Sequence, residues 1–165
     1  MEAYDRVIWR GSAMTRRQRQ ALIFTENIIR RDRPKWDFRF SVPQGSWRPF
    51  SDWSGSSHTK AGVVDLQYYG FYGEYGFNTR TEREKALYVL RALRAIGRQA
   101  AFLRGARDGM INHFHVCDLD TRGMSDTSAI FQVPEYRRGN NGLNAGVKDR
   151  YQYRPDPIRK WTFKP

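Results

Sequence analysis

All three histidines of the chain lie in two short motifs whose residue types could bind a metal ion. His58 stands at the end of a loop rich in glycine and serine, and Asp65 follows it by seven residues inside a short apolar run. His113 and His115 form an H-x-H pair further along the chain. A catalytic zinc site takes three protein ligands from His, Asp, Glu and Cys and leaves one position for water. His58, Asp65 and one histidine of the pair would make such a set.

The alternative is that these side chains are structural. A lone histidine is far more often a satisfied core or surface residue than a ligand, and the H-x6-D spacing alone favours that reading for His58 and Asp65. The gathering of every histidine beside a loop-to-strand junction and a paired strand favours the metal instead. Cys117, on the same strand face as the H-x-H pair, is an alternative ligand, although a single buried cysteine is usually a small apolar residue.

Two helices are predicted to flank these motifs. Residues 14–31 ("MTRRQRQALIFTENIIRR") read as a helix that Thr15 can cap and that Pro34 ends. Residues 81–97 ("TEREKALYVLRALRAIG") show the strongest helical period of the chain and stop at Gly97.

Strands are predicted to carry the candidate ligands. Residues 38–42 ("FRFSV") alternate as a half-buried strand does, and residues 62–66 ("GVVDL") form a second strand in which Asp65 points away from its apolar neighbours, into a cleft. Residues 100–104 and 110–119 read as a β-hairpin with an Asp-Gly turn signal at 108–109. One face of its second strand would carry His113, His115 and Cys117.

These elements predict an α+β fold, in which a small antiparallel sheet is flanked by two main helices. Three parts are expected along the chain: an N-terminal arm (1–13), the domain itself (14–117) and an irregular basic extension (118–165) that packs on the domain or on a partner. The length of 165 residues agrees with one domain.

The chain is strongly basic, with 29 lysines and arginines against 17 acidic residues and a net charge of +12. Such a field predicts a polyanionic partner. The basic residues are scattered and show no nucleic-acid-binding signature, so an anionic cell-wall polymer or a membrane surface fits as well as nucleic acid does. The single cysteine excludes an intrachain disulfide. We expect no signal peptide and no transmembrane segment, because no apolar run has the required length.

The stretch "SSHTKAGVVDL" is similar to the S-x-H-x-x-G-x-A-x-D-L motif of the D-Ala-D-Ala carboxypeptidase-type zinc peptidases. That group shares a small α+β fold with the lysostaphin-type endopeptidases and the Hedgehog signalling domain. The match needs one extra residue around "TKAG", and Val64 replaces the usual small residue. The order of a helix, "AAFLR" and "NHFHV" resembles the actinobacterial and actinobacteriophage branch of the group, so the resemblance covers residues 14–116. The matching positions are Ser56, His58, Gly62, Asp65 and Leu66.

The resemblance implies that His58, Asp65 and His115 bind zinc and that His113 is free for catalysis. Many relatives carry a glutamate base three residues before the last ligand, and here that position is Asn112, which cannot take a proton. Two explanations follow: His113 acts as base or oxyanion donor, as the first histidine of H-x-H is thought to do in the lysostaphin-type relatives, or the protein has lost turnover. We favour His113.

The resemblance also points to Gln44 and Arg48, which occupy the region where relatives place a polar or arginine side chain facing the substrate. An arginine could clamp a terminal carboxylate through two parallel hydrogen bonds. An equally strong alternative is that Arg48 is one of many solvated arginines.

The function expected from the resemblance is that of a hydrolase: a zinc metallopeptidase that degrades the bacterial cell wall by cutting an amide bond in the peptidoglycan stem peptide or crosslink. We expect a bacteriophage endolysin, released from the cytoplasm of the infected host to the wall, or a virion-associated hydrolase. One alternative is a catalytically silent tail protein that binds other virion proteins, and a weaker one is a basic nucleic-acid-binding protein.

Overall fold

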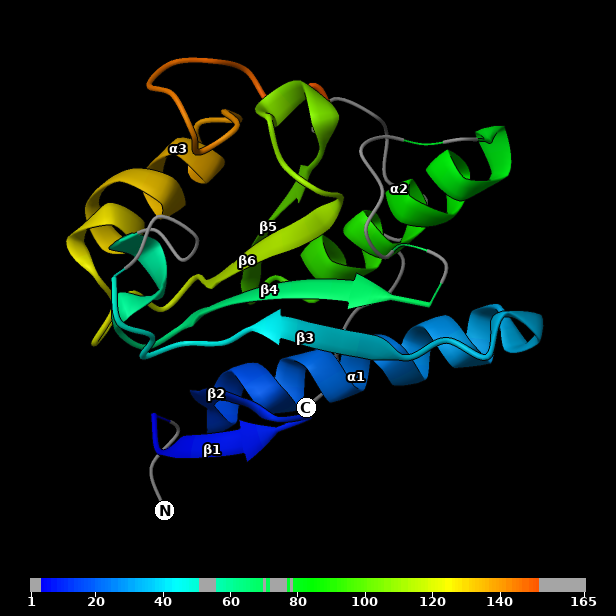
Figure 1. Ribbon diagram of the computed structural model, residues 1–165, viewed down its shortest axis with the longest axis horizontal. Coiled ribbons are helices and arrows are strands. Elements are labelled where there is room, and N and C mark those ends of the chain that lie inside the picture. The colour runs from blue at the N-terminus through cyan, green and yellow to red at the C-terminus, as the bar shows by residue number, and fades with distance from the viewer. Residues whose placement is uncertain (1–3, 51–55, 70, 72–76, 78, 152–165) are drawn as a thin grey trace.

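The computed structural model describes residues 4–50, 56–69, 71, 77 and 79–151 (Figure 1). Its centre is a four-stranded sheet in the order β3-β4-β6-β5, with every neighbouring pair antiparallel. The prediction of an α+β fold with a small antiparallel sheet is therefore confirmed. The strands are β3 (Phe40–Gln44), β4 (Val63–Tyr68), β5 (Gln99–Arg104) and β6 (His113–Asp118).

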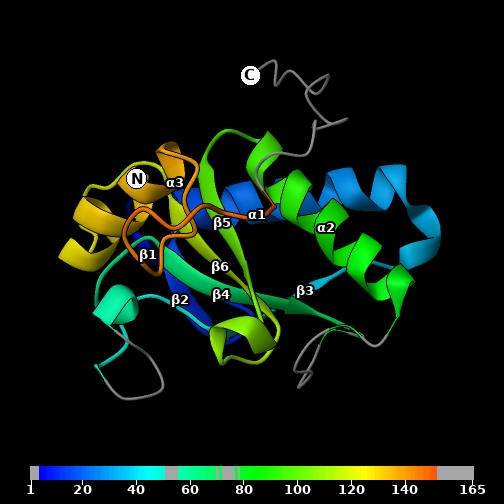
Figure 2. The same cartoon turned by 90° about the horizontal axis from the view of Figure 1, so that it is seen from above.

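Both predicted helices are present as α1 (Arg16–Asp32) and α2 (Arg80–Ala95), and they cover one face of the sheet (Figures 1 and 2). The Thr15 hydroxyl accepts a hydrogen bond from the Gln18 N–H at 3.0 Å, so the predicted cap starts α1. Apolar side chains from both helices and from alternate positions of the strands form the main core between them. The opposite sheet face is left to carry the polar residues of β4 and β6.

A short helical segment covers part of that opposite face. Residues Thr127–Gln132 form a π-helical turn (η4), which continues into α3 (Val133–Arg137). A second apolar cluster lies under it and joins Val133 and Met124 to residues of β4, β5 and β6. The expectation of an irregular segment from residue 118 onward is therefore wrong for these helical residues. The described part of the extension packs on the domain, and residues 152–165 lie outside the described residues.

The expected N-terminal arm contains a β-hairpin, of β1 (Arg6–Trp9) and β2 (Ser12–Thr15), which was not predicted. It lies beside α1 and next to β3 (Figure 1). The Ser12 hydroxyl donates to the Val42 carbonyl at 2.7 Å, and the Arg10 guanidinium pairs with Glu26 of α1. The hairpin is thus tied to the elements that flank the site.

The strand boundaries differ from the sequence prediction by one to three residues, most at the starts of β3 and β6 and at the ends of β3 and β4. β3 begins two residues later than expected, at Phe40, and β6 begins at His113 instead of residue 110. The connection between β5 and β6 is a longer loop than a tight Asp-Gly turn, because a 3-10 turn over Ala106–Asp108 precedes Gly109 in its left-handed conformation. Along the stretches that the structure describes, no helix combines the length and apolar character needed to cross a bilayer.

Candidate metal centre

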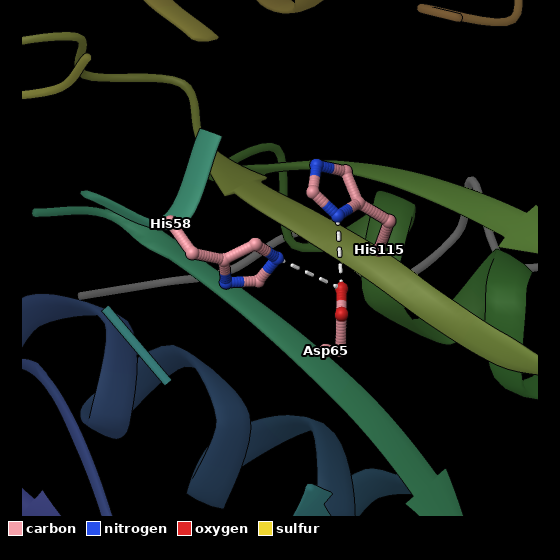
Figure 3. Close-up of side chains that lie close together, drawn as sticks. All are labelled: His58, Asp65 and His115. Carbon is pink, nitrogen blue, oxygen red and sulfur yellow. Dashed lines mark hydrogen bonds and ion pairs between the residues drawn. The ribbon is translucent and has the colours of Figure 1, made fainter. Parts of the chain in front are cut away.

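The sheet brings His58, Asp65 and His115 together on the face opposite α1 and α2 (Figure 3). Asp65 and His115 are directly opposite each other in the β4–β6 register, so their side chains share one face. His58 reaches the same point from a 3-10 turn, Ser56–Thr59, that precedes β4. All three side chains are buried, and their ligand atoms lie within 4.8 Å of one another.

The loop around Gly45 orients the His58 ring. His58 Nδ1 lies 3.1 Å from the Gly45 carbonyl oxygen, which can only accept, so Nδ1 carries the proton. The lone pair of His58 Nε2 then faces Asp65 Oδ1 at 3.3 Å. A Cβ at position 45 would lie 2.4 Å from the Ala13 carbonyl oxygen, so only glycine lets the chain pass so close to the hairpin.

The helical segment η4 orients the His115 ring through Gln132. Oε1 of Gln132 lies 3.2 Å from His115 Nε2, and it also accepts a hydrogen bond from the Ser128 hydroxyl at 3.0 Å. An amide oxygen only accepts, so the His115 proton is on Nε2. The lone pair of His115 Nδ1 is therefore directed at Asp65 Oδ1, 2.8 Å away.

Two imidazole lone pairs thus converge on one carboxylate oxygen in a buried space. Three electron-rich atoms in contact repel one another unless a cation or a proton lies among them. In a tetrahedral zinc site with bonds of about 2.0–2.1 Å, neighbouring ligand atoms lie roughly 3.3 Å apart. The separations of the His58 and His115 nitrogens from Asp65 Oδ1, 3.3 and 2.8 Å, are close to that value. The three residues form a buried group that could hold a metal ion.

The charges of this group also suit a cation. Burial on its own raises the pKa of Asp65. When a proton on His58 or His115 takes the place of the cation, the resulting charge and hydrogen bonds outweigh burial and hold the pKa of the carboxyl well below its usual range. Burial lowers the pKa of His115 below 6.5, so this imidazole is neutral at neutral pH. A metal ion needs its carboxylate ligands deprotonated and its imidazole ligands neutral, and Asp65 and His115 are in these states.

His113, the predicted catalytic residue, lies at the edge of the same group. Its Nδ1 is 2.7 Å from the Ile111 carbonyl oxygen, so Nδ1 carries the proton and Nε2 keeps its lone pair. That Nε2 lies 3.9 Å from Asp65 Oδ1. The His113 side chain is 16% exposed, compared with 8% for His115, so it is the more accessible of the two histidines on β6.

The two predicted substrate residues have different places in the structure. Gln44 pairs with Asp65 in the β3–β4 register, so the strand brings it directly beside the group. Arg48 is exposed, and its guanidinium donates to the Pro43 carbonyl at 3.4 Å, while its backbone N–H donates to the His58 carbonyl at 2.9 Å. Its visible contribution is to brace the turn that carries His58.

Cys117, the alternative ligand, shares the face of the group but is not placed as a fourth donor. Its Sγ lies 3.6 Å from His115 Nε2, the nitrogen that points away from Asp65. Burial raises the pKa of the Cys117 thiol, which stays protonated and donates toward Gln132 Oε1 at 3.4 Å. Asn112 is buried, and its backbone carbonyl accepts a hydrogen bond from the Gln67 side chain at 2.8 Å.

Gln132, whose side-chain oxygen accepts a hydrogen bond from His115 Nε2, was not predicted from the sequence. Its segment, residues 127–132, has no clear helical period, and the distance of 17 residues from His115 offers no local signal. Gly45, the acceptor for His58, was likewise only part of a loop in the sequence. Such outer partners orient metal ligands in most metal sites.

We expect the Gln132→Ala substitution to weaken zinc binding about 10- to 100-fold, because the acceptor that fixes the His115 ring and its tautomer is lost. Zinc affinity can be measured by competition with a chromophoric chelator. Gln20→Ala, an exposed glutamine on α1, serves as the matched control and should bind like the wild type. An unchanged affinity in Gln132→Ala would show that this hydrogen bond does not support the site.

Acid should release zinc from the protein at a lower pH than from an exposed peptide that carries the same ligands. Protons compete with the metal for its ligands, and the pKa values of Asp65 and His115 are both lowered, so their protonation begins at lower pH than in an exposed peptide. A titration that follows zinc release spectroscopically from pH 8 downward tests this expectation. A release midpoint at or above that of the exposed peptide would contradict it.

The chain was also compared with protein-family models, with curated proteins and with solved structures. No significant match was found in any of the three comparisons. The functional conclusion therefore depends on the residues of this chain and on their arrangement.

Proposed function

We propose that the protein is a zinc-dependent peptidoglycan peptidase of the D-Ala-D-Ala carboxypeptidase and lysostaphin type. The observation that carries this proposal is the convergence of the His58 and His115 lone pairs on one oxygen of Asp65 in a buried space. The same three residues are the ligands that the sequence resemblance implies. A neighbouring histidine with a free Nε2 adds a group that could move protons.

Under this proposal, His58, Asp65 and His115 would hold the zinc ion. Bound there, zinc supplies Lewis acidity, which polarises an amide carbonyl and makes water more acidic. Nε2 of His113 takes a proton from the attacking water as the new C–O bond forms, and then returns it to the amine as the C–N bond breaks. Gln44, which pairs with Asp65 in the β3–β4 register, would orient the substrate carbonyl.

The proposed setting is a phage endolysin or a virion-associated wall hydrolase. A net charge of +12 attracts the protein to an anionic cell wall, where its substrate lies. Other virion or tail proteins are candidate partners in the virion-associated case. The nucleic-acid alternative has only the net charge to support it.

One observation favours a second candidate, a silent peptidase-like structural protein of a phage particle. Asn112 stands where many of the resembled peptidases have their glutamate base, and it is buried. The position of His113 beside Asp65 offers another base and favours the enzyme.

The test combines zinc analysis with hydrolysis of purified peptidoglycan. The proposal expects about one zinc ion per chain and new amines released from the wall by the zinc-loaded protein, with no release after chelation and recovery when zinc is restored. The matched control is a His58→Ala, His115→Ala double variant. Zinc without amine release from walls of several chemotypes would support the structural protein, and absence of zinc would overturn both the centre and the peptidase.

A further inference from the structure

Arg104 is a buried arginine on the sheet face that carries the candidate metal centre. It ends β5 and lies directly opposite His113 in the β5–β6 register, so the two side chains share a face. Only 3% of Arg104 is exposed. Neither the sequence motifs nor the proposed reaction uses this residue.

The guanidinium of Arg104 lies close to the candidate metal ligands. Its central carbon is 4.8 Å from the centre of the Phe102 ring, and that ring is 6.3 Å from the His115 imidazole. Phe102 is also the residue directly opposite His115 in the sheet. On this face of the sheet, the pair of Arg104 and His113 is therefore the neighbour of the pair of Phe102 and His115.

Arg104 also has an unused hydrogen-bond donor. Its Nη2 is buried and has no hydrogen-bond partner among the described residues. Burial of a charged donor without a partner is costly, and burial here lowers the pKa of Arg104. An unpartnered buried donor calls for an explanation, such as a functional role or a bound water or ion.

The carboxylates around Arg104 are already engaged. Asp149 forms an ion pair with Arg94 of α2, and Asp108 accepts the Gly105 N–H at 3.3 Å. Asp65 faces the histidines. These groups attract Arg104 electrostatically but leave Nη2 without a bond.

A cavity of about 150 Å³ adjoins Arg104. Residues 147–151 form much of its wall. Lys148 and Arg150 add positive charge there, and the engaged carboxylates of Asp108 and Asp149 also line it. The chain just before residues 147–151 packs closely on β5, because a Cβ at Gly142 would lie 2.7 Å from the Phe102 ring. The cavity has room for a small anionic group and lies along the end of β5, since Phe102, Leu103 and Arg104 line it.

We propose that Arg104 binds a carboxylate of the substrate and thereby selects peptides that carry a free carboxylate near the amide bond to be cut. This inference rests on the proposed peptidase function and assigns it a specificity residue. A carboxylate is the anion that a guanidinium recognises with the best geometry, and peptide stems supply it. The bound group could be the terminal carboxylate of the peptide or the free α-carboxylate of a γ-linked D-glutamate.

Two pairs of synthetic peptides distinguish these sources. The first pair is N-acetyl-lysyl-D-alanyl-D-alanine as free acid and as terminal carboxamide. The second pair differs only in whether the α-carboxylate of a γ-linked D-glutamate is free or amidated. Binding is measured by calorimetry on the full-length zinc-loaded His113→Ala protein, so that turnover does not consume the peptides. The same measurements are made after Arg104→Gln or Arg104→Lys is added.

The expected result is that the free acid of one pair binds about 10- to 100-fold more tightly than its amide, which is the effect of one lost hydrogen bond to a charged group. Arg104→Gln should bring the acid-to-amide ratio close to one, and Arg104→Lys should give an intermediate ratio because a point charge replaces the planar fork. Zinc content and thermal unfolding report whether the variants fold. If Arg104→Gln does not fold, the ratio in Arg104→Lys decides.

A ratio close to one for both pairs, or a ratio that Arg104 substitution leaves unchanged, would overturn the inference. The wall assay separates this failure from failure of the proposed function. Zinc-dependent amine release without acid preference rejects the role of Arg104 and leaves the peptidase standing. Acid preference that depends on Arg104 without any amine release supports the carboxylate site and rejects the peptidase.

Discussion

Replacing Asp65 by asparagine should remove zinc from the protein and reduce wall hydrolysis to background. Asp65 is the only anion of the His-Asp-His group, and its Oδ1 is the atom on which the histidines converge. The amide of asparagine has nearly the same shape but no charge, so it leaves the fold in place while removing most of the attraction for a dication. Because loss of an outer partner alone costs about 10- to 100-fold in affinity, loss of this ligand should cost more.

Asp126→Asn is the matched control, since Asp126 is exposed and lies outside the group. It should bind zinc and hydrolyse wall like the wild type. Metal analysis after gel filtration and amine release from peptidoglycan report the two properties on one sample. Stoichiometric zinc in Asp65→Asn would show that the metal, if bound, is held elsewhere in the chain.

The candidate site was predictable from sequence where it depends on strand alternation. In "GVVDL", alternation alone places Asp65 on the face away from Val64 and Leu66, and those two residues are indeed in the main core. The same rule places His113 and His115 on one face of β6. The antiparallel hairpin of β5 and β6 was also predictable, since each strand has its own pattern.

The rest of the site depends on contacts between residues far apart in the chain. The register that sets Asp65 opposite His115 spans 50 residues, and Arg104 becomes relevant only because β5 lies at the edge next to β6. Gln132 belongs to a helical segment whose composition does not predict a helix. Tertiary packing, through the apolar cluster under Val133, places that segment on the sheet.

The N-terminal hairpin shows the same limit. Its two four-residue strands are too short for a clear alternating pattern, and a hairpin of this size has little stability of its own. It becomes ordered through contacts with the domain, such as the Ser46 N–H that donates to the Ala13 carbonyl at 2.7 Å. That contact in turn fixes the loop that orients His58, so a segment without chemistry of its own contributes to the site.

His113→Ala should lower kcat/KM for wall peptides by about 100- to 10,000-fold while zinc content stays at one per chain. His113 presents an unprotonated Nε2 beside the centre, but its removal leaves the three ligand atoms in place. The partner variant His113→Gln separates the two roles that the sequence left open. Glutamine can donate a hydrogen bond to an oxyanion but cannot take a proton, so a general base predicts equal losses in both variants and an oxyanion donor predicts partial rescue by glutamine.

Metal analysis of the same variants gives a second readout of the role of His113. Loss of zinc from His113→Ala would instead make His113 a ligand. Unchanged hydrolysis in both variants would exclude His113 from the reaction and, because Asn112 cannot take a proton, would require a base from another part of the chain.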